Sequence, residues 1–300
     1  QNAQLDPKEI EKEKRVVLEE IQSVEDTPED LVHDLFAKSV WGRHPVGEPI
    51  LGTRESVSAF TPELLCDFMH RHYQPGRMIF CAAGNLDHDR FIDKLSEVFG
   101  TAVPDLSTLE RARPELAHGH EQHHSRDIGQ THICLGAVGY AYTHPRTHEL
   151  LVANTALGGG MSSRLFQEIR ERLGLAYAVY SYLEMLEDTG LFGTYIACDQ
   201  ARVEQVVEIV RAELDRFRTE GISEKELESS KAQLRGELIL GFESMDRRMS
   251  RMARDELYEG RLRTAEDVLA RIDGVTQESM VEACKELAKE EHLHLVTLGP

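Results

Sequence analysis

The sequence predicts an α+β protein made of two similar domains. Its 300 residues correspond to two domains at roughly 150 residues per domain. Helical patterns alternate with short apolar strands, and two of these strands flank a turn that is typical of an antiparallel hairpin. One stretch in the first part of the chain also matches a stretch near its end, which indicates an internal duplication.

The composition excludes several classes of protein. Lys and Arg number 34 against 53 Asp and Glu, which leaves a formal charge of -19 and disfavours binding to nucleic acid or to an anionic membrane surface. No apolar run is long enough to cross a bilayer. The five cysteines are scattered and never form a C-x-x-C pair, so they predict neither a disulfide framework nor a thiolate zinc site. We expect a protein of a reducing compartment, the cytoplasm.

The first part of the chain is predicted to be mostly helical. Asp6 and Pro7 have the residue types of an N-cap and a first helical position, so a helix is expected over residues 8–22. Glycines and prolines mark residues 41–53 as a loop. The other expected elements are helices over 27–37, 61–73 and 89–99 and a short strand over 78–83.

The second part combines strands and helices. The polar, histidine-rich stretch 101–130 is expected to hold the domain boundary. We place the end of the first domain at residues 1–115, a linker at 116–130 and the second domain at 131–300. Strands are expected over 131–138, 178–185, 191–198 and 293–298, and helices over 148–157 and from Ser162 or Ser163 to Leu173.

The internal repeat aligns residues 57–84 with residues 272–299 without a gap. Thr61 matches Thr276 and Gly84 matches Gly299, and the helix entry at 5–11 likewise matches 222–228. By this alignment, roughly 85 residues of the first unit would precede Gln1, so the first domain is expected to be truncated at its N-terminus. Chance similarity of two helix–strand segments remains the alternative.

Two carboxylates share one face of the first predicted helix. Glu13 and Glu20 lie seven residues apart and therefore project within about 20° of each other. Taken alone, this spacing fits a solvated face of a helix that is rich in Glu and Lys.

In combination, several longer stretches resemble the insulinase/pitrilysin family of zinc metallopeptidases, in particular its bacterial processing-protease branch. They run from one end of the chain to the other and comprise residues 13–30, 44–53, 73–75, 82–85 and 157–177. The resemblance implies two homologous domains, each an antiparallel sheet with helices packed on it. It also implies a Zn²⁺-dependent endopeptidase that cleaves peptides or unfolded protein segments.

The resemblance assigns Glu20 as a zinc ligand and Glu13 as the carboxylate that orients the metal ligands. The family's H-x-x-E-H motif, which supplies two histidine ligands and the general base, does not occur in these 300 residues. We expect it upstream of Gln1, so the chain by itself is expected to be an inactive fragment.

The same resemblance places Arg170 and Tyr177 against the scissile carbonyl, where they would stabilise the oxyanion. It makes Gly159, Gly160 and Ser162 candidates for substrate contact, although a helix break and an N-cap explain these three residues nearly as well. It further implies a homodimer or pairing with a homologous subunit. The alternative function is that of a catalytically silent relative, acting as a structural or peptide-presenting partner.

Two other motifs suggest competing sites. Residues 120–124, His-Glu-Gln-His-His, satisfy the H-E-x-x-H pattern in which a helix presents His120 and His124 to zinc. Because no apolar periodicity surrounds them, we expect a solvated histidine-rich loop instead. The glycines at 158–160 are not followed by Gly-Lys-Ser or Gly-Lys-Thr, so a nucleotide-binding loop is rejected.

Overall fold

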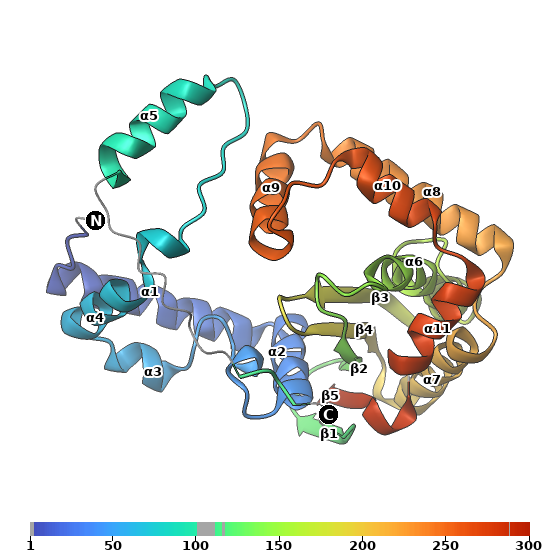
Figure 1. Ribbon diagram of the computed structural model, residues 1–300. Helices are drawn as coiled ribbons and strands as arrows, with labels where there is room; N and C mark the ends of the chain where they lie inside the picture. The colour runs from blue at the N-terminus through green and yellow to red at the C-terminus, as the bar shows by residue number, and fades with distance from the viewer. Residues whose placement is uncertain (1–2, 101–111, 116–117, 288) are drawn as a thin grey trace. The chain divides into compact units, whose positions relative to one another are not determined.

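A computed structural model describes residues 3–100, 112–115, 118–287 and 289–300 (Figure 1). The chain divides into two compact units. The helical unit comprises Gln1–Ser23, Pro49–Ala112 and Leu240–Leu262. The sheet unit comprises Val24–Glu48, Arg113–Ile239 and Arg263–Pro300.

The sheet unit is built on five strands in the order β1-β5-β2-β4-β3. The strands are β1 (Glu121–Ser125), β2 (Thr131–Gly139), β3 (Ala176–Met185), β4 (Gly190–Cys198) and β5 (His294–Gly299). β3 and β4 form the expected antiparallel hairpin, and β2 pairs antiparallel with both β4 and β5. Four of the predicted strands, β2 to β5, are therefore confirmed.

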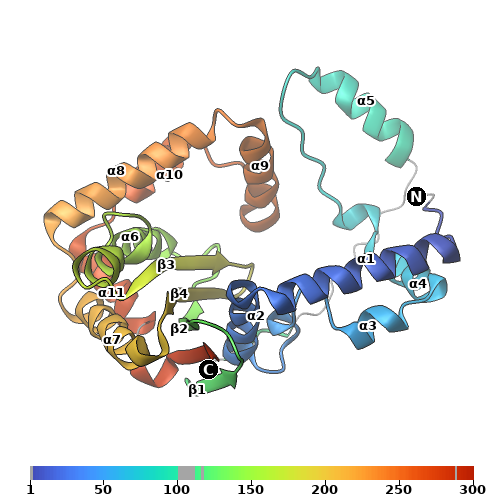
Figure 2. The same ribbon diagram turned by 180° about the vertical axis from the view of Figure 1, so that it is seen from behind.

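Helices cover both faces of this sheet, as Figures 1 and 2 show from opposite sides. The helices α6 (Thr147–Gly158), α7 (Val203–Thr219) and α11 (Gln277–Leu287) contact the strands on one face. α2 (Pro28–Trp41) packs on β2 and β5 on the other face.

Side chains alternate between the two faces because successive residues of a strand point in opposite directions. In β2, Ile133 and Leu135 join the core beneath α6 and α7, whereas Cys134 joins the core beneath α2. In the same way, Leu295 and Val296 of β5 belong to the two opposite cores.

The remaining helices belong to one unit or the other. They are α1 (Pro7–Asp26), α3 (Arg54–Ala59), α4 (Pro62–His72), α5 (His88–Phe99), α8 (Glu224–Gly241), α9 (Met245–Glu259) and α10 (Ala265–Asp273). Short 3-10 turns occupy Pro45–Gly47, Pro75–Arg77, Gln200–Arg202 and Glu290–His292, and Phe166–Arg172 forms a π-helix.

Local sequence explains where several helices begin. The Asp6 carboxylate accepts a hydrogen bond from the backbone N–H of Lys8 at 2.7 Å, so the predicted cap of α1 is confirmed. The Thr61 hydroxyl accepts from the N–H of Leu64, and Pro62 occupies the first helical turn of α4. The predicted helices over 61–73 and 89–99 thus correspond to α4 and α5.

The structure repeats as the sequence does. When residues 57–84 are aligned with 272–299, Pro62–His72 (α4) coincides with Gln277–Leu287 (α11), and the 3-10 turn Pro75–Arg77 coincides with Glu290–His292. The alignment of residues 5–11 with 222–228 likewise brings together the first residues of α1 and α8. The repeat in the sequence is therefore matched by a repeat of helices and turns in the structure.

Two secondary-structure predictions are wrong. Residues 78–83 form no strand, because an extended segment needs a neighbouring strand for its hydrogen bonds and has none among the described residues. The histidine-rich stretch expected as a loop contains strand β1, which pairs with β5 in parallel. The sheet is consequently mixed and not purely antiparallel, although the α+β class is confirmed.

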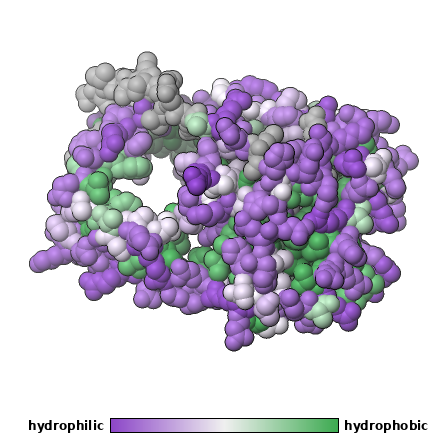
Figure 3. Space-filling view, turned by 90° about the horizontal axis from the view of Figure 1, so that it is seen from below, coloured by the Kyte–Doolittle hydropathy of each residue, from purple (hydrophilic) through white to green (hydrophobic). Residues whose placement is uncertain are grey.

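The helical unit exposes many of its apolar side chains. It buries Ile21 and Val57. Between about 40% and 60% of the surface remains exposed at Val16, Phe60, Leu64, Phe68, Tyr73, Ile79, Phe80, Leu86, Ile92, Val98 and Leu257. Figure 3 shows apolar patches of this kind on a mainly hydrophilic surface. Across the described ranges, no helix is both long enough and apolar enough to span a membrane.

Candidate functional site

The structure brings the two predicted oxyanion-stabilising residues together. The guanidinium carbon of Arg170 lies 4.4 Å from the centroid of the Tyr177 ring and 4.7 Å from that of Phe166. Such distances are those of cation–π contacts. Arg170 is held between two aromatic rings, and 34% of its side-chain surface is exposed to solvent. Its donors are therefore fixed in place but open to solvent.

A π-helix positions Arg170. In the segment Phe166–Arg172 the backbone follows the wider i→i+5 pattern, and the Leu173 N–H donates to the Glu168 carbonyl at 3.1 Å. Leu165 and Ile169, both fully buried, hold one side of this turn in the core. Gly174 then ends the helix with φ +58°, a conformation that favours glycine. π-helical turns of this kind are frequent at functional sites.

A β-bulge positions Tyr177. Ala176 pairs with Cys198 and Ala178 pairs with Ala197, so Tyr177 is an extra residue between two consecutive partners. A bulge redirects the side chain of the extra residue, and Tyr177 is 76% exposed. Its ring reaches Arg170 across the Gly174 turn with its phenol in solvent.

The glycine run has a packing explanation. A Cβ on Gly158 would lie 2.3 Å from the backbone nitrogen of Ser181 on β3, so only glycine allows α6 to approach the strand this closely. The Gly159 carbonyl accepts a hydrogen bond from Gln233 at 3.1 Å, and a Cβ on Gly160 would meet the Gln233 side chain at 3.6 Å. Substrate contact by Gly159, Gly160 and Ser162 stays a prediction: Gly160 is half-buried and Ser162 is exposed, whereas Gly158 serves packing.

Glu13 and Glu20 lie on α1 in the helical unit, and both are exposed. The ion pairs along this helix, Lys12–Glu9 and Lys14–Glu11, involve other carboxylates. In the described part of the chain, no three His, Cys, Asp or Glu side chains converge to hold a metal ion. The residues present do not by themselves form a zinc site.

Comparison with known proteins identifies the family. The family model described as Insulinase (Peptidase family M16) matches residues 1–54, and the one described as Peptidase M16 inactive domain matches residues 59–234. The uncharacterized zinc protease YmxG of Bacillus subtilis is 38% identical over 287 residues, which cover 96% of this chain and 70% of that protein. The chain belongs to the insulinase family.

Other relatives agree with this assignment. An uncharacterized zinc protease of Streptomyces coelicolor is 39% identical over 278 residues. The match covers 90% of this insulinase-family chain but only 61% of that relative, so the chain spans less than two thirds of its length. A crystal structure of a peptidase M16 inactive domain from Pseudomonas fluorescens superposes with a TM-score of 0.88 at 23% identity, covering 98% of this chain and 71% of that one. It shares the fold.

The alternative zinc motif of this insulinase-family chain is not supported. The H-E-x-x-H pattern requires a helix that brings His120 and His124 onto one face, one turn apart. The segment instead continues into strand β1, and residues four apart on a strand are separated by about 13 Å. One metal ion cannot bridge that distance.

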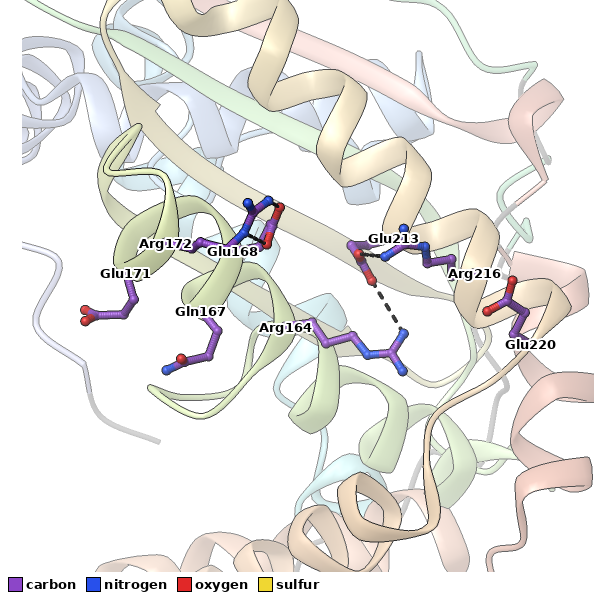
Figure 4. A pocket seen from close by; sticks show the side chains of 8 residues that line it. All are labelled: Arg164, Gln167, Glu168, Glu171, Arg172, Glu213, Arg216 and Glu220. Carbon is purple, nitrogen blue, oxygen red and sulfur yellow. Dashed lines mark hydrogen bonds and ion pairs between the residues drawn. The ribbon is translucent and has the colours of Figure 1, made fainter.

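An open hollow beside the π-helix is lined by charged side chains (Figure 4). The lining residues are Arg164, Gln167, Glu168, Glu171, Arg172, Glu213, Arg216 and Glu220. Most of these charges pair with each other, as in the contacts Arg172–Glu168, Arg164–Glu213 and Arg216–Glu213. We assign the hollow a structural role for this reason.

Arg164 anchors the loop that follows Gly160. Its Nε lies 2.6 Å from the Glu226 carboxylate on α8. The hydrogen bond from Arg164 is the main reason that the pKa of Glu226 falls to about 2. The turn that carries the exposed Ser162 is therefore tied to α8 through the ion pair of Arg164 with Glu226.

Sequence analysis missed a polar cluster beneath α2. Both ring nitrogens of His33 lie 3.0 Å from tyrosine hydroxyls, one from Tyr182 and one from Tyr180. Tyr180 also donates to Glu29 at 3.3 Å. Burial lowers the pKa of His33, which favours its neutral form. No spacing along the chain could have indicated this cluster, because the histidine and the two tyrosines are far apart in the sequence.

Proposed function

We propose that the full-length protein containing this chain is a zinc-dependent endopeptidase that cleaves peptides or unfolded protein segments. The observation that carries the proposal is the contact between Arg170 and Tyr177, which gathers two hydrogen-bond donors at an exposed bulge. Relatives at 38% and 39% identity bear the name zinc protease, which supports the reaction class.

The two donors suit the transition state of peptide hydrolysis. When a nucleophile adds to a peptide carbonyl, negative charge develops on the oxygen, and donors already in place stabilise that charge. A guanidinium group supplies several N–H donors and a positive charge, and the phenol supplies one O–H donor. Because Phe166 and Tyr177 fix the position of the Arg170 side chain, little reorganisation is needed during the reaction.

The proposal places the remaining zinc ligands outside these 300 residues. The sequence contains no H-x-x-E-H, and Glu20 supplies a single carboxylate that cannot hold the ion alone. The proposal therefore assigns two histidine ligands and the general base to another part of the full-length protein. It assigns Glu20 as the third ligand and Glu13 as the carboxylate that orients the site.

The substrate would lie beside the Arg170–Tyr177 pair. On the loop that Arg164 anchors, Gly160 offers a half-buried backbone and Ser162 an exposed hydroxyl. Backbone groups of such a loop can pair with an extended peptide of any sequence. A second copy of the chain, or a homologous subunit, is proposed to complete the enclosure around the substrate.

Peptidase assays on the full-length protein test the proposal. With a fluorogenic peptide, Arg170→Ala is expected to lower kcat by about 10²-fold, the typical effect of losing one oxyanion donor. The matched control is Arg172→Ala, two residues away, whose side chain is exposed and bound to Glu168. Normal turnover by the Arg170→Ala enzyme would remove this residue from the mechanism. A full-length protein that lacks turnover altogether would favour the silent partner subunit.

A further inference from the structure

The sheet unit ends in a strand whose outer edge is open. β1 is the last strand on one side of the order β1-β5-β2-β4-β3, and β5 is its single partner among the described residues (Figure 1). It lies at the opposite edge of the sheet from β3, which carries Tyr177. Four residues of β1, Glu121, Gln122, His123 and Ser125, are exposed. An exposed edge strand is a place where an extended peptide can add to a sheet.

Alternate backbone groups of β1 point away from β5. The N–H of Leu295 donates to the His120 carbonyl at 3.0 Å. At the other end of the strand, the N–H of Arg126 donates to the Gly299 carbonyl at 2.8 Å. Because residues that bond to a neighbouring strand alternate with residues that face away from it, the even-numbered residues of β1 bond to β5. The residues whose N–H and C=O groups face outward are Glu121, His123 and Ser125.

A hollow, here named the β1 hollow, opens beside this edge. Its volume is about 560 Å³, which is within the range of ligand-binding pockets. β1 contributes Glu121 and His123 to its lining, and the start of α7 contributes Val203, Glu204 and Val207. The lining therefore combines apolar side chains with carboxylates.

The charge in the β1 hollow favours a cationic ligand. Within the described part of the chain, its lining includes the carboxylates of Glu121 and Glu204 and neither lysine nor arginine. Glu121 lies 2.8 Å from Arg211, but this arginine is shared with Glu290. Glu204 is exposed and forms no ion pair with another described residue. The formal charge of -19 on the chain also attracts positively charged partners.

The open edge and the β1 hollow can serve one ligand. Neighbouring strands lie about 4.8 Å apart, and every second side chain of a strand points to the same face. A strand added beside β1 would thus place alternate side chains next to Glu121 and His123, on the face that lines the hollow. A long basic side chain there can pack its aliphatic stem on Val203 and Val207 and bring its charge to the carboxylates.

We propose that the outer edge of β1 and the β1 hollow bind an extended peptide segment that carries Lys or Arg at alternate positions. The backbone of the peptide pairs with the outward groups of Glu121, His123 and Ser125, and its basic side chains pair with Glu121 and Glu204. The polar side chains of β1 suit a hydrophilic segment, since they offer no apolar strip to an aggregating strand. Binding needs neither zinc nor the Arg170–Tyr177 pair, so its failure and the failure of the proposed peptidase are separate results.

Fluorescence anisotropy on the full-length protein tests the role of charge. The probe is a labelled peptide in which arginine alternates with threonine, and a chelator keeps the probe intact. Glu204→Gln is expected to weaken binding by up to about fivefold, the effect of losing one exposed charge pair. Glu208→Gln is the matched control, because Glu208 is exposed one turn later on α7 and does not line the β1 hollow. A probe with glutamate in place of arginine that binds equally well would overturn the proposal.

Two N-methylated forms of the probe test strand addition. N-methyl groups on every arginine, or on every threonine, block the amides of one edge of the peptide, so one form is expected to bind and the other to lose binding. Equal binding of the two forms would exclude pairing with β1.

His123→Pro tests the same edge from the side of the protein. It removes an outward N–H that β5 does not use, and proline is tolerated at such edge positions. The variant is expected to keep its melting temperature within the range of an ordinary surface variant and to lose the probe. Its unchanged affinity would overturn the proposal, as would a dimer of the parent protein that does not bind the probe and that His123→Pro separates. If the variant does not fold, Glu204→Gln and the N-methylated probes decide the outcome.

Discussion

The Arg170 guanidinium lies over the face of the Tyr177 ring at 4.4 Å, between the π-helix and the bulged start of β3. Both residues depend on a local irregularity of the backbone for their position. The wide turn of the π-helix positions Arg170, and Tyr177 is itself the extra residue of the bulge. Regular versions of the same helix and strand would direct the two side chains elsewhere.

The phenol of Tyr177 can be tested apart from its ring. Tyr177→Phe keeps the surface on which Arg170 stacks but removes the hydroxyl donor. In the full-length protein we expect kcat to fall by about 10²-fold while KM changes little, measured with a fluorogenic peptide. Because the side chain is 76% exposed, the melting temperature should stay within the range of an ordinary surface variant. An unchanged kcat would show that the hydroxyl of Tyr177 takes no part in the reaction and that the residue contributes only the ring on which Arg170 stacks.

The two carboxylates on α1 should differ in their effect on zinc. In the full-length protein, Glu20→Gln is expected to abolish stoichiometric zinc, because it removes a ligand. Glu13→Gln is expected to reduce the zinc affinity by about 10–100-fold, because it removes an orienting group. Metal content by atomic spectroscopy and competition with a chelator measure both. Glu19→Gln is the matched control, since Glu19 is exposed on another face of α1. Full zinc content in Glu20→Gln would exclude this residue as a ligand.

Gly158 is expected to tolerate no side chain. A Cβ there would lie 2.3 Å from the Ser181 nitrogen, so Gly158→Ala should lower the free energy of unfolding by about 1–3 kcal/mol. A Cβ added to Gly236, inside α8, would have no atom within 4 Å apart from its chain neighbours and the backbone of its own helix. Gly236→Ala should therefore raise the free energy of unfolding by up to about 1 kcal/mol. Urea denaturation of both variants measures the contrast, and equal effects would contradict the packing role of Gly158.

His148 is expected to make stability depend on pH. Burial, reinforced by the charges of Arg271 and Arg263, lowers its pKa to about 4 from an ordinary value of 6.5. Between these two values the unfolded chain binds a proton that the folded chain does not, so stability decreases as the pH falls through this range. In His148→Gln the decrease should be shallower by up to about 1.4 kcal/mol per pH unit.

Urea denaturation at several pH values between 6.5 and 4 measures this slope. His88→Gln, which changes an exposed histidine on α5, is the control for the His-to-Gln substitution itself. If His148→Gln and the parent chain lose stability in parallel, the histidine does not control this pH dependence.

Local sequence was sufficient to predict the helices with clear caps, such as α1 after Asp6 and α4 after Thr61, because a cap satisfies backbone groups within a few residues. It was also sufficient for β2 to β5, from their apolar runs, and for the internal duplication and the family. These features depend on local patterns or on stretches of matching residues, both of which can be read along the chain.

The pairing of β1 with β5, in contrast, depends on contacts between residues that are far apart in the sequence. The same pairing brings the rings of His120 and His294 into contact. Long-range contacts also explain why residues 78–83 form no strand, although their apolar pattern matches β5 in the repeat. The physical reason is the same in each case. A strand exists only where another strand supplies its hydrogen bonds, and the contact of Arg170 with Tyr177 depends on a bulge that is defined by the register of β3 against β4. Neighbours distant in sequence set these features, so they become visible only in the folded chain.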